Sequence, residues 1–377
     1  MKLWNVLTIY ACLSCAATLA QSPIGESHTT VRDFTDSAGT AVPSDSPQNR
    51  KGNIFKQFFR AFNAMDTTYI TPNKYNWAFM LQNTNSFETY TLHSRELGQK
   101  LSFSPRPAIK IGPYLGWRWI FLGYTFEVSS LGKGQQSKKT EFELSLYSSM
   151  LGCDLIYRRT GDDFRLRKVK GLGEEAREVE GENYHGINVK VTGINAYYIF
   201  NHKRFSYPAA FAQSTVQRKS CGSWKVGFAY TRHELDFDYN ALPPVLTHNP
   251  NHELSQDFQV DKVKYTDFSL SCGYAYNWVF ARNCLACISL TPAIAYKASD
   301  VDAETHEGKQ WYSKFNLDFL IRAGIVYNNG KYFVGSSFVG KNYNYHRNNF
   351  SLDNGFGTLQ VYAGFNFHLR KEYRKKK

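Results

Sequence analysis

Residues 268–278 read FSLSCGYAYNW, and large apolar side chains alternate there with small or polar ones. A period of two places successive side chains on opposite faces of a β-strand. The same alternation recurs at 288–296, 315–327 and 359–369. Such runs are longer than the usual globular strand of about 5–6 residues and match a tilted membrane strand of about 9–11 residues. They predict a sheet with one face toward lipid and the other toward a polar lumen.

The chain accommodates twelve such strands, an even number. We predict them at 86–95, 107–117, 119–129, 140–150, 151–160, 187–201, 222–238, 263–280, 284–298, 311–328, 331–345 and 356–369. The tight links lie around Trp117, between Met150 and Leu151, at 281–283 and at 328–330. The long polar loops lie on the opposite side, at 130–139, 161–186, 239–262, 299–310 and 346–355. Short turns on one side and long loops on the other are typical of an antiparallel transmembrane β-barrel of the outer membrane.

One connection on the short-turn side is long. Residues 202–221 contain Phe205, Tyr207 and Phe211, followed by a basic stretch at 217–219. We expect this segment to fold into the lumen or to pack beneath it. The alternative is an ordinary long loop, because long loops are often, but not always, functional.

The amino terminus has the pattern of a secretory signal peptide. Lys2 precedes the apolar run 3–19, and small residues surround Ala20, so we expect cleavage near Ala20 and assign residues 1–20 to the signal. A membrane anchor would need about 20 predominantly apolar residues. A lipoprotein would need a modified Cys12 or Cys15, and the residues around both disfavour it.

Residues 21–75 are expected to form a periplasmic leader before a barrel at 76–369. Residues 21–50 contain almost no large apolar side chains, so they cannot bury enough surface to fold. Residues 51–63 place Ile54 and four phenylalanines at helical spacing, which predicts a short amphipathic helix. This helix rests on the inner leaflet, plugs the base of the barrel or packs on the first strand. A basic tail at 370–377 completes the chain.

Charge and composition narrow the class of partner. The net charge is +13, aromatic residues make up 16% of the chain, and the mean hydropathy is -0.44. Nucleic acid is excluded because exported proteins rarely meet it and no compact basic and aromatic surface is visible. Loop 161–186 has a basic half and then an acidic half, which is either a solvated loop or a site for lipopolysaccharide phosphates.

Polar positions of the predicted strands carry charges of both signs. They are Glu127, Glu141, Glu143, Lys190, Lys225, Lys297, Asp318 and Arg322. Such a lumen is expected to be narrow and partly cross-linked by salt bridges, whereas an open selective pore more often has one dominant sign. Twelve strands also fall between filled barrels of about eight strands and open porins of about 16–18, so a wide general-diffusion pore is disfavoured.

The sequence offers no catalytic, cofactor or metal site, and we expect no enzyme activity. It contains neither a Gly-x-Ser-x-Gly elbow nor a His-Glu-x-x-His motif. Cys284 and Cys287 form a single Cys-x-x-Cys, a weak zinc signal, and on an extended strand the two side chains point to opposite faces. The mature chain would hold five cysteines, an odd number that disfavours a disulfide framework.

Several short motifs resemble a family of uncharacterised outer-membrane proteins catalogued as domain of unknown function 4421. They are the entry segment at 66–70, the stretch FSYPAAF at 205–211, and Gln217-Arg218-Lys219-Ser220 followed by Gly222-Ser223. The resemblance covers about residues 60–369. It implies a barrel-like envelope protein and brings no catalytic residues. The tail at 370–377 departs from barrels that stop at the last aromatic strand.

Two classes of function follow from these expectations. A narrow channel, transport or lipid-binding barrel would have a polar lumen and mobile outer loops. A structural or assembly component of the envelope would have a filled lumen and a working periplasmic face built from the amino-terminal helix, residues 202–221 and the tail. The expected location is the cell outer membrane. The expected partners are its lipids, including lipopolysaccharide, and a periplasmic protein.

Overall fold

The computed structural model describes residues 65–117, 120–123, 126–128, 140–161, 164–248, 252–259, 261–299, 315–347 and 349–374. The chain separates into two units, Met1–Gly52 and Asn53–Lys377, and every described residue belongs to the second. The predicted signal peptide, the leader segment at 21–50 and the helix at 51–63 therefore lie outside the described residues. So do the loop at 130–139 and nearly all of the loop at 299–310.

Strands account for most of the described chain. They are β1 Ile70–Pro72, β2 Tyr75–Ser94, β3 Gln99–Pro105, β4 Ala108–Trp117, β5 Ile120–Gly123, β6 Phe126–Glu127, β7 Thr140–Tyr147, β8 Leu151–Gly161, β9 Phe164–Lys170, β10 Asn183–Tyr184, β11 Ile187–Ile199, β12 Thr215–Gln217, β13 Cys221–Phe237, β14 Lys262–Ala281, β15 Cys284–Ser299, β16 Phe315–Asn328, β17 Tyr332–Arg347 and β18 Phe350–Leu369. The helical segments are α3 Tyr207–Phe211, α4 Pro244–Thr247 and the 3-10 turns Glu175–Arg177, Tyr239–Ala241, Gln256–Phe258 and Lys371–Tyr373. No helix in these described ranges is long and apolar enough to cross a membrane.

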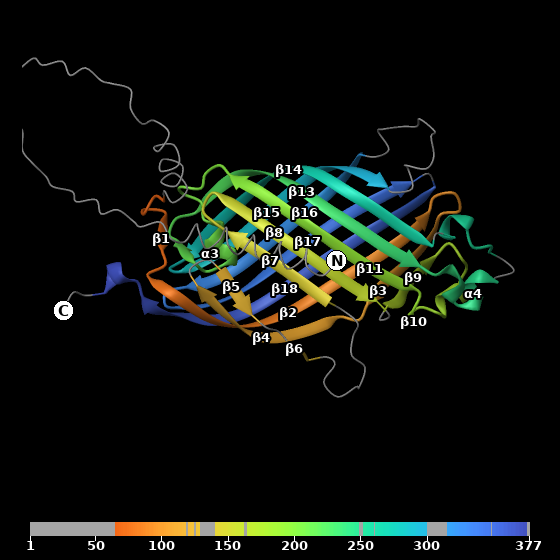
Figure 1. Cartoon of the computed structure of the whole chain (residues 1–377), viewed down its shortest axis with the longest axis horizontal. Coiled ribbons are helices and arrows are strands. Elements are labelled where there is room, and N and C mark those ends of the chain that lie inside the picture. Colours follow the sequence, from red (N-terminus) through yellow and green to blue (C-terminus); the bar gives the residue numbers. More distant parts are fainter. Residues whose placement is uncertain are drawn as a thin grey trace, which may run out of the picture. The chain divides into compact units, whose positions relative to one another are not determined.

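The strands form an antiparallel barrel whose first and last long strands meet (Figure 1). β2 pairs with β18 along almost its entire length, and β18 is followed around the wall by β17, β16, β15, β14, β13, β11 and β8. At one end β2 pairs with β3, β3 with β9 and β9 with β10. Because β9 follows β8 and β10 leads into β11, the sheet returns on itself there.

At the other end β2 pairs with β4, which carries β5 and β6. No backbone ladder joins this group to β7 among the described residues, but Lys110 on β4 forms an ion pair with Glu141 on β7. The sheet contains sixteen strand segments. Four pairs of consecutive segments each form one interrupted barrel strand: β3 with β4, β5 with β6, β8 with β9 and β10 with β11. Counted in this way, the described segments form twelve barrel strands, as predicted.

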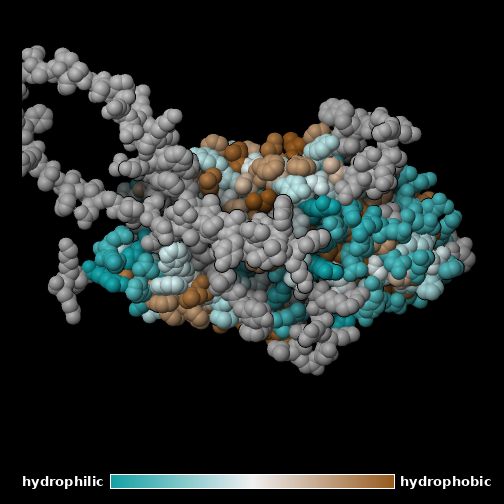
Figure 2. All heavy atoms as spheres, in the orientation of Figure 1, coloured by the Kyte–Doolittle hydropathy of each residue, from teal (hydrophilic) through white to brown (hydrophobic). Residues whose placement is uncertain are grey.

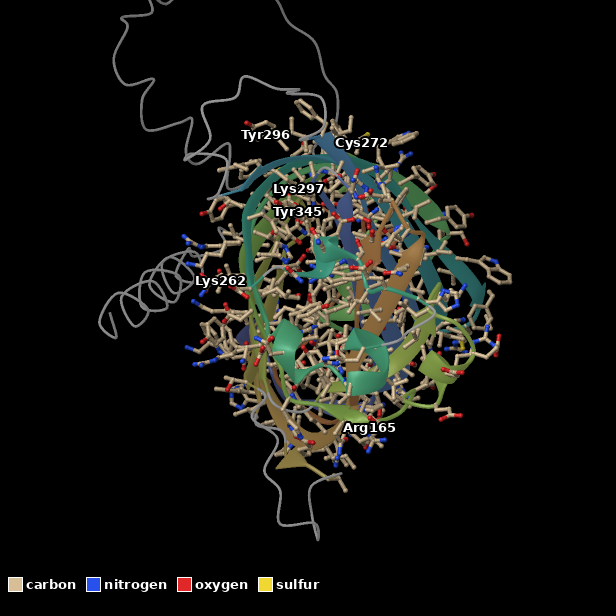
Figure 3. The ribbon with its side chains drawn as sticks, turned by 90° about the vertical axis from the view of Figure 1, so that its right-hand side faces the viewer. Arg165, Lys262, Cys272, Tyr296, Lys297 and Tyr345 are labelled. Atoms are coloured by element: carbon tan, nitrogen blue, oxygen red, sulfur yellow. The ribbon has the colours of Figure 1, made fainter. Side chains whose placement is uncertain are left out.

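The two faces of the wall match the predicted alternation. The large apolar side chains singled out on β14, β15, β16 and β18 are exposed to the outside, for example Leu270 (69%), Ile288 (59%) and Leu317 (50%). Figure 2 shows hydrophobic residues along the middle of the wall and hydrophilic residues at both ends. In Figure 3, Tyr296 and Cys272 project outward, whereas Lys297 and Tyr345 lie inside the ring. This belt of exposed apolar side chains around a polar interior is the arrangement of a transmembrane barrel.

Several predicted boundaries are wrong, since β3 and β9 lie in predicted links and loops, and two further ones share a reason. The first strand begins at Tyr75 rather than at residue 86, and residues 346–355 belong mostly to β17 and β18 rather than to a loop. Ala78 and Met80 face inward but pack on residues 209–210, so apolar side chains occupy both faces of early β2. In contrast, residues 346–355 are mostly polar on both faces. Period two is visible only where one face is apolar and the other is polar.

Candidate functional site in the barrel lumen

Residues 202–217 form a plug at the short-turn end of the barrel. Within it, Ser206 accepts a hydrogen bond from the backbone N–H of Ala209, and Pro208 occupies the first turn of α3. A serine cap and a proline at the start favour a helix even of this short length. Beyond α3, β12 pairs with β1, which precedes the barrel wall. The prediction that this segment folds into or beneath the lumen is confirmed.

The plug is fastened to three strands of the wall by side-chain hydrogen bonds. Gln213 Nε2 donates to the hydroxyl of Tyr362 on β18 at 2.6 Å. Asn277 Nδ2 on β14 donates to the carbonyl oxygen of Ser206 at 2.9 Å, and Asn328 Nδ2 on β16 donates to the carbonyl of Gln213 at 3.3 Å. These three strands alternate within a run of five neighbouring strands, so the bonds fasten the plug along that part of the wall.

Aromatic side chains fill the space between plug and lumen. Tyr207 is fully buried, and its ring centroid lies 5.0 Å from that of Phe211 and 5.8 Å from that of Tyr197 on β11. Lys225 Nζ on β13 donates to the Tyr207 hydroxyl at 2.9 Å. Burial raises the pKa of Tyr207, so its hydroxyl stays protonated. The inner end of the lumen is therefore closed by packed side chains.

Ion pairs occupy the middle of the lumen. Lys297 Nζ lies 2.8 Å from Asp267 Oδ2 and 3.1 Å from Asp318 Oδ1, and all three residues are buried. Arg322 pairs with Asp154 and donates to the Tyr147 hydroxyl at 2.5 Å. Buried charges persist only when they are paired and hydrogen-bonded. The Arg322 network thus links β16 to β7 and β8 across the lumen, whereas the Lys297 network joins the neighbouring strands β14, β15 and β16.

A third network lies beside β2 and β8. Arg158 Nε lies 3.4 Å from Glu141 Oε1 and 3.7 Å from Glu88 Oε1. Next to it is a cavity of about 20 Å³ lined in part by Lys341 and Tyr343. A cavity of that size holds roughly one water molecule. These side chains leave little free space in this part of the lumen.

A large apolar cluster, here called the outer core, closes the long-loop end. It combines inward-facing strand residues with residues of the segments 171–182 and 238–258. The loop residues in it are Leu172, Ala176, Val179, Leu242, Leu246, Leu254 and Phe258. Phe103 is fully buried there, with its ring 4.9 Å from Tyr184 and 5.8 Å from Phe237. Loops 161–186 and 239–262 are therefore not purely solvated, because their apolar residues fill the mouth.

Most of the predicted lumen charges lie where we expected them. Lys225, Lys297, Asp318 and Arg322 are buried inside the barrel, and Glu141 is almost so. Glu127 lies opposite Lys110 in the ladder between β4 and β6. The side chain of Glu143 lies outside the described part of the structure.

The prediction for Lys190 is wrong. Its side chain is 40% exposed and lies 3.8 Å from Glu234, its partner residue on β13. On β11 the odd-numbered residues face inward, so Lys190 faces outward. Outward-facing polar residues occur here because this end of the strand lies beside the outer loops, where the apolar face ends.

Sequence reasoning missed several lumen charges. Glu88, Asp154, Arg158 and Asp267 are buried and take part in the three networks. Each lies on the same face of its strand as small or polar residues, which is the signal that could have identified them.

In the described ranges the cysteines form no disulfide, and the His, Cys, Asp and Glu residues form no metal-binding cluster. Cys153, Cys221, Cys272, Cys284 and Cys287 are free thiols. Cys287 is buried on the lumen side beside residues 209–210, whereas Cys284 is only partly buried. Within these ranges no three His, Cys, Asp or Glu residues are placed to hold a metal ion.

Comparison with known proteins gives one family match. The family described as Domain of unknown function (DUF4421) matches residues 64–367. No curated protein matches the chain.

Solved structures similar to this one include several outer-membrane barrels. The outer membrane protease OmpT from Escherichia coli is 8% identical, with 79% of this chain and 98% of that chain covered and a TM-score of 0.32. The translocator domain of the autotransporter NalP from Neisseria meningitidis is 10% identical, with 84% and 94% covered and a TM-score of 0.27. The toluene transporter TodX of P. putida is 9% identical, with 78% and 91% covered and a TM-score of 0.20. No activity is transferred from proteins this distant.

Proposed function

This chain belongs to the DUF4421 family, and we propose that it is a closed outer-membrane barrel that serves as a structural or assembly component of the cell envelope. In this proposal its working surface is the short-turn end, which faces the periplasm in barrels of this type. In this proposal the side chains in the lumen fill it rigidly and leave no path for solutes.

The observation that carries the proposal is the closure of the inner mouth by residues 202–217. Phe205 and Tyr207 are both fully buried there. Full burial of one such side chain stabilises a structure by about 1.5–3 kcal/mol, so these two together contribute about 3–6 kcal/mol. Each 1.4 kcal/mol corresponds to about a tenfold change in population, so an open form would be rare.

Single-channel recording in planar bilayers tests the proposal. The purified full-length protein is expected to give no steady conductance. The variant Tyr207→Ala removes the aromatic centre of the plug and is expected to produce openings. Tyr230→Ala, which removes an exposed tyrosine from β13, is the matched control and should stay silent. Large, steady, weakly selective conductance from the unmodified protein would make passive diffusion the leading function.

A gated channel is the second candidate, and one observation favours it. The plug is joined to the wall by side-chain hydrogen bonds from Asn277, Asn328 and Tyr362 rather than by a ladder with the barrel strands. Such contacts can be broken without disturbing the barrel itself. A gate would therefore move the plug while the wall stays intact.

Accessibility of Cys287 separates the two candidates, because this thiol lies inside the barrel against α3. A variant would keep Cys287 and replace the other four described cysteines, and both signal-region cysteines, with serine. A fixed plug predicts slow labelling by a water-soluble maleimide at the unfolding rate of the protein. Labelling far faster than unfolding would favour the gated channel. The same variant unfolded in denaturant, where Cys287 is accessible to water, controls for reagent quality.

A further inference from the structure

The short-turn end of the barrel carries a concentrated positive charge. Its described segments contain ten basic residues, which we call the basic face: Lys74, Lys203, Arg204, Arg218, Lys219, Arg282, Lys331, Arg370, Lys371 and Arg374. The same segments contain two carboxylates, Asp66 and Glu372. These cations come from five separate parts of the chain, and the barrel topology gathers them at one end.

The described segment 164–182 at the opposite end has no such imbalance, so the basic face does not simply reflect a basic chain. Segment 164–182 at that end contains Arg165, Arg167, Lys168, Lys170 and Arg177, but also five glutamates from 174 to 182. Because positive charge is in large excess at the short-turn end and balanced by glutamates in segment 164–182, the electrostatic field is directed along the barrel axis. Such a field attracts anionic partners to the short-turn end.

Four of the ten cations lie at or just beyond the two ends of the plug rather than on the barrel wall, and contacts hold three of them in place. Arg218 donates from Nε to Thr71 Oγ1 at 2.8 Å and from Nη1 to Asn283 Oδ1 at 2.9 Å. The Arg204 guanidinium lies 5.2 Å and the Lys219 ammonium 5.3 Å from the centre of the Tyr69 ring. Side chains held in place lose less entropy when they bind a partner.

Asp66 is the carboxylate that contacts these plug cations, and it is already bonded to Thr68 and Arg204. It accepts hydrogen bonds from the hydroxyl and backbone N–H of Thr68, and its Oδ2 lies 3.4 Å from Arg204 Nε. The Thr68 bonds, followed by Arg204, hold the pKa of Asp66 below its usual range, so it stays ionised at neutral pH. One carboxylate thus faces the four plug cations Lys203, Arg204, Arg218 and Lys219.

The position of these cations indicates which anion they meet. Phospholipid headgroups surround the outside of the wall, where Lys74, Arg282, Lys331 and Arg370 begin or end wall strands. The plug cations are carried by the segment that covers the mouth and by its contact with β1. A ligand that bridges them approaches along the barrel axis from the aqueous side.

We infer that the basic face, centred on the four plug cations, binds an acidic segment of a periplasmic protein rich in aspartate and glutamate. This inference rests on the proposed function and names the class of partner for the same surface. Individual exposed ion pairs contribute little, but several together guide association and make it depend on salt. Arginine and lysine donors that are already held in position suit carboxylates.

Poly-L-glutamate binding to the full-length protein in nanodiscs of zwitterionic lipid tests the inference. We expect saturable binding that weakens by at least about tenfold when salt rises from about 50 mM to about 300 mM. Replacing Lys203, Arg204, Arg218 and Lys219 with glutamine should weaken binding by at least about tenfold at low salt. Heat-modifiable migration on a gel checks that each variant is folded.

Two variants with the same change in charge serve as controls. Glutamine at Lys74, Arg282, Lys331 and Arg370 alters the rim, and glutamine at Arg167, Lys168, Lys170 and Arg177 alters the opposite end. Both should retain most of the binding. Absence of saturable binding, or an equal loss in the opposite-end variant, would overturn the inference.

A lipid role for the basic face is a distinct outcome. If the rim variant alone loses both poly-L-glutamate and bound anionic phospholipid, the face belongs to the membrane surface and the inference fails. The conductance test stays independent of this result. A closed barrel that binds no acidic peptide would refute the inference but not the proposed function, and an open barrel would refute only the latter.

Discussion

The two ends of the barrel are closed by apolar clusters of different size. The outer core joins loops and strands through buried apolar side chains such as Phe103, Leu246 and Phe258. The plug at the other end is joined to the wall by packing of its own buried apolar side chains and by hydrogen bonds with Asn277, Asn328 and Tyr362. Apolar packing has no alternative partner in water, whereas amide and hydroxyl groups can exchange theirs for water at little net cost. The apolar clusters around the plug are smaller than the outer core, so we expect the inner closure to separate from the wall more readily than the outer one.

The largest expected effect is the loss of an outer-core aromatic. Phe103→Ala leaves a cavity among Tyr184, Phe237 and their neighbours and should lower the free energy of unfolding by about 3–5 kcal/mol. Urea unfolding in detergent or lipid measures it. Phe228→Ala, on the exposed face of β13, is the control and should cost much less. Equal losses would mean that the outer end is not a packed core.

An effect of similar size is expected in the lumen, where Arg322→Met leaves Asp154 buried without its cation. Breaking a buried ion pair in this way costs about 3–5 kcal/mol. The double variant Arg322→Met with Asp154→Leu should recover much of that loss, because no charge is left unpaired. The same unfolding measurement tests both. A double variant as unstable as the single one would contradict the pairing.

Arginine on the lipid face should cost less, about 2–4 kcal/mol at mid-membrane depth. The positions are Leu317, Phe319 and Ile321, which are all exposed on β16. Asn316→Arg, on the opposite face of the same strand, should be mild. Refolding yield into vesicles, with the unfolding free energy, measures the difference. Equal tolerance at both sets of positions would show that the register or the lipid-facing side is wrong.

The smallest expected effect concerns the cap of α3. Ser206→Ala removes the acceptor for the Ala209 N–H and should cost about 0.5–2 kcal/mol. If the inner closure separates more readily, this loss should appear as faster maleimide labelling of Cys287, with global unfolding almost unchanged. An equal change in both measurements would show that the plug and the barrel unfold together.

The barrel wall could be predicted from the sequence because every second side chain of a membrane-spanning strand faces lipid. Leu270, Ile288 and Leu317 alternate with small or polar residues, so strand number, faces and the short turns followed from a period of two. The alternation of apolar and polar residues disappears where a strand packs on the plug, as at Met80. It also disappears where a strand extends past the apolar belt toward the outer loops, as at Lys190. The start of the first strand was missed at the former place, and the face of Lys190 at the latter.

The interior could be predicted only in part. The charges at Lys297, Asp318 and Arg322 were identified, but their partners Asp267 and Asp154 were not. Pairing across a barrel depends on register and on the order of strands around the wall, which a period of two does not contain. The outer core was missed because its loop residues, such as Leu172 and Leu246, are isolated among polar neighbours.

The pairing of β2 with β18 has a consequence for how the protein forms. Asn73 donates a hydrogen bond to Asn366, 293 positions later, so the seam joins opposite ends of the folded chain. Contacts between such distant residues form slowly, because a long stretch of chain must be ordered first. Until β18 arrives, β2 has an unpaired edge that hydrocarbon cannot satisfy. Closing this seam is thus the step that commits the chain to the membrane, and a protein interrupted before residue 350 should remain outside it and aggregate through that edge.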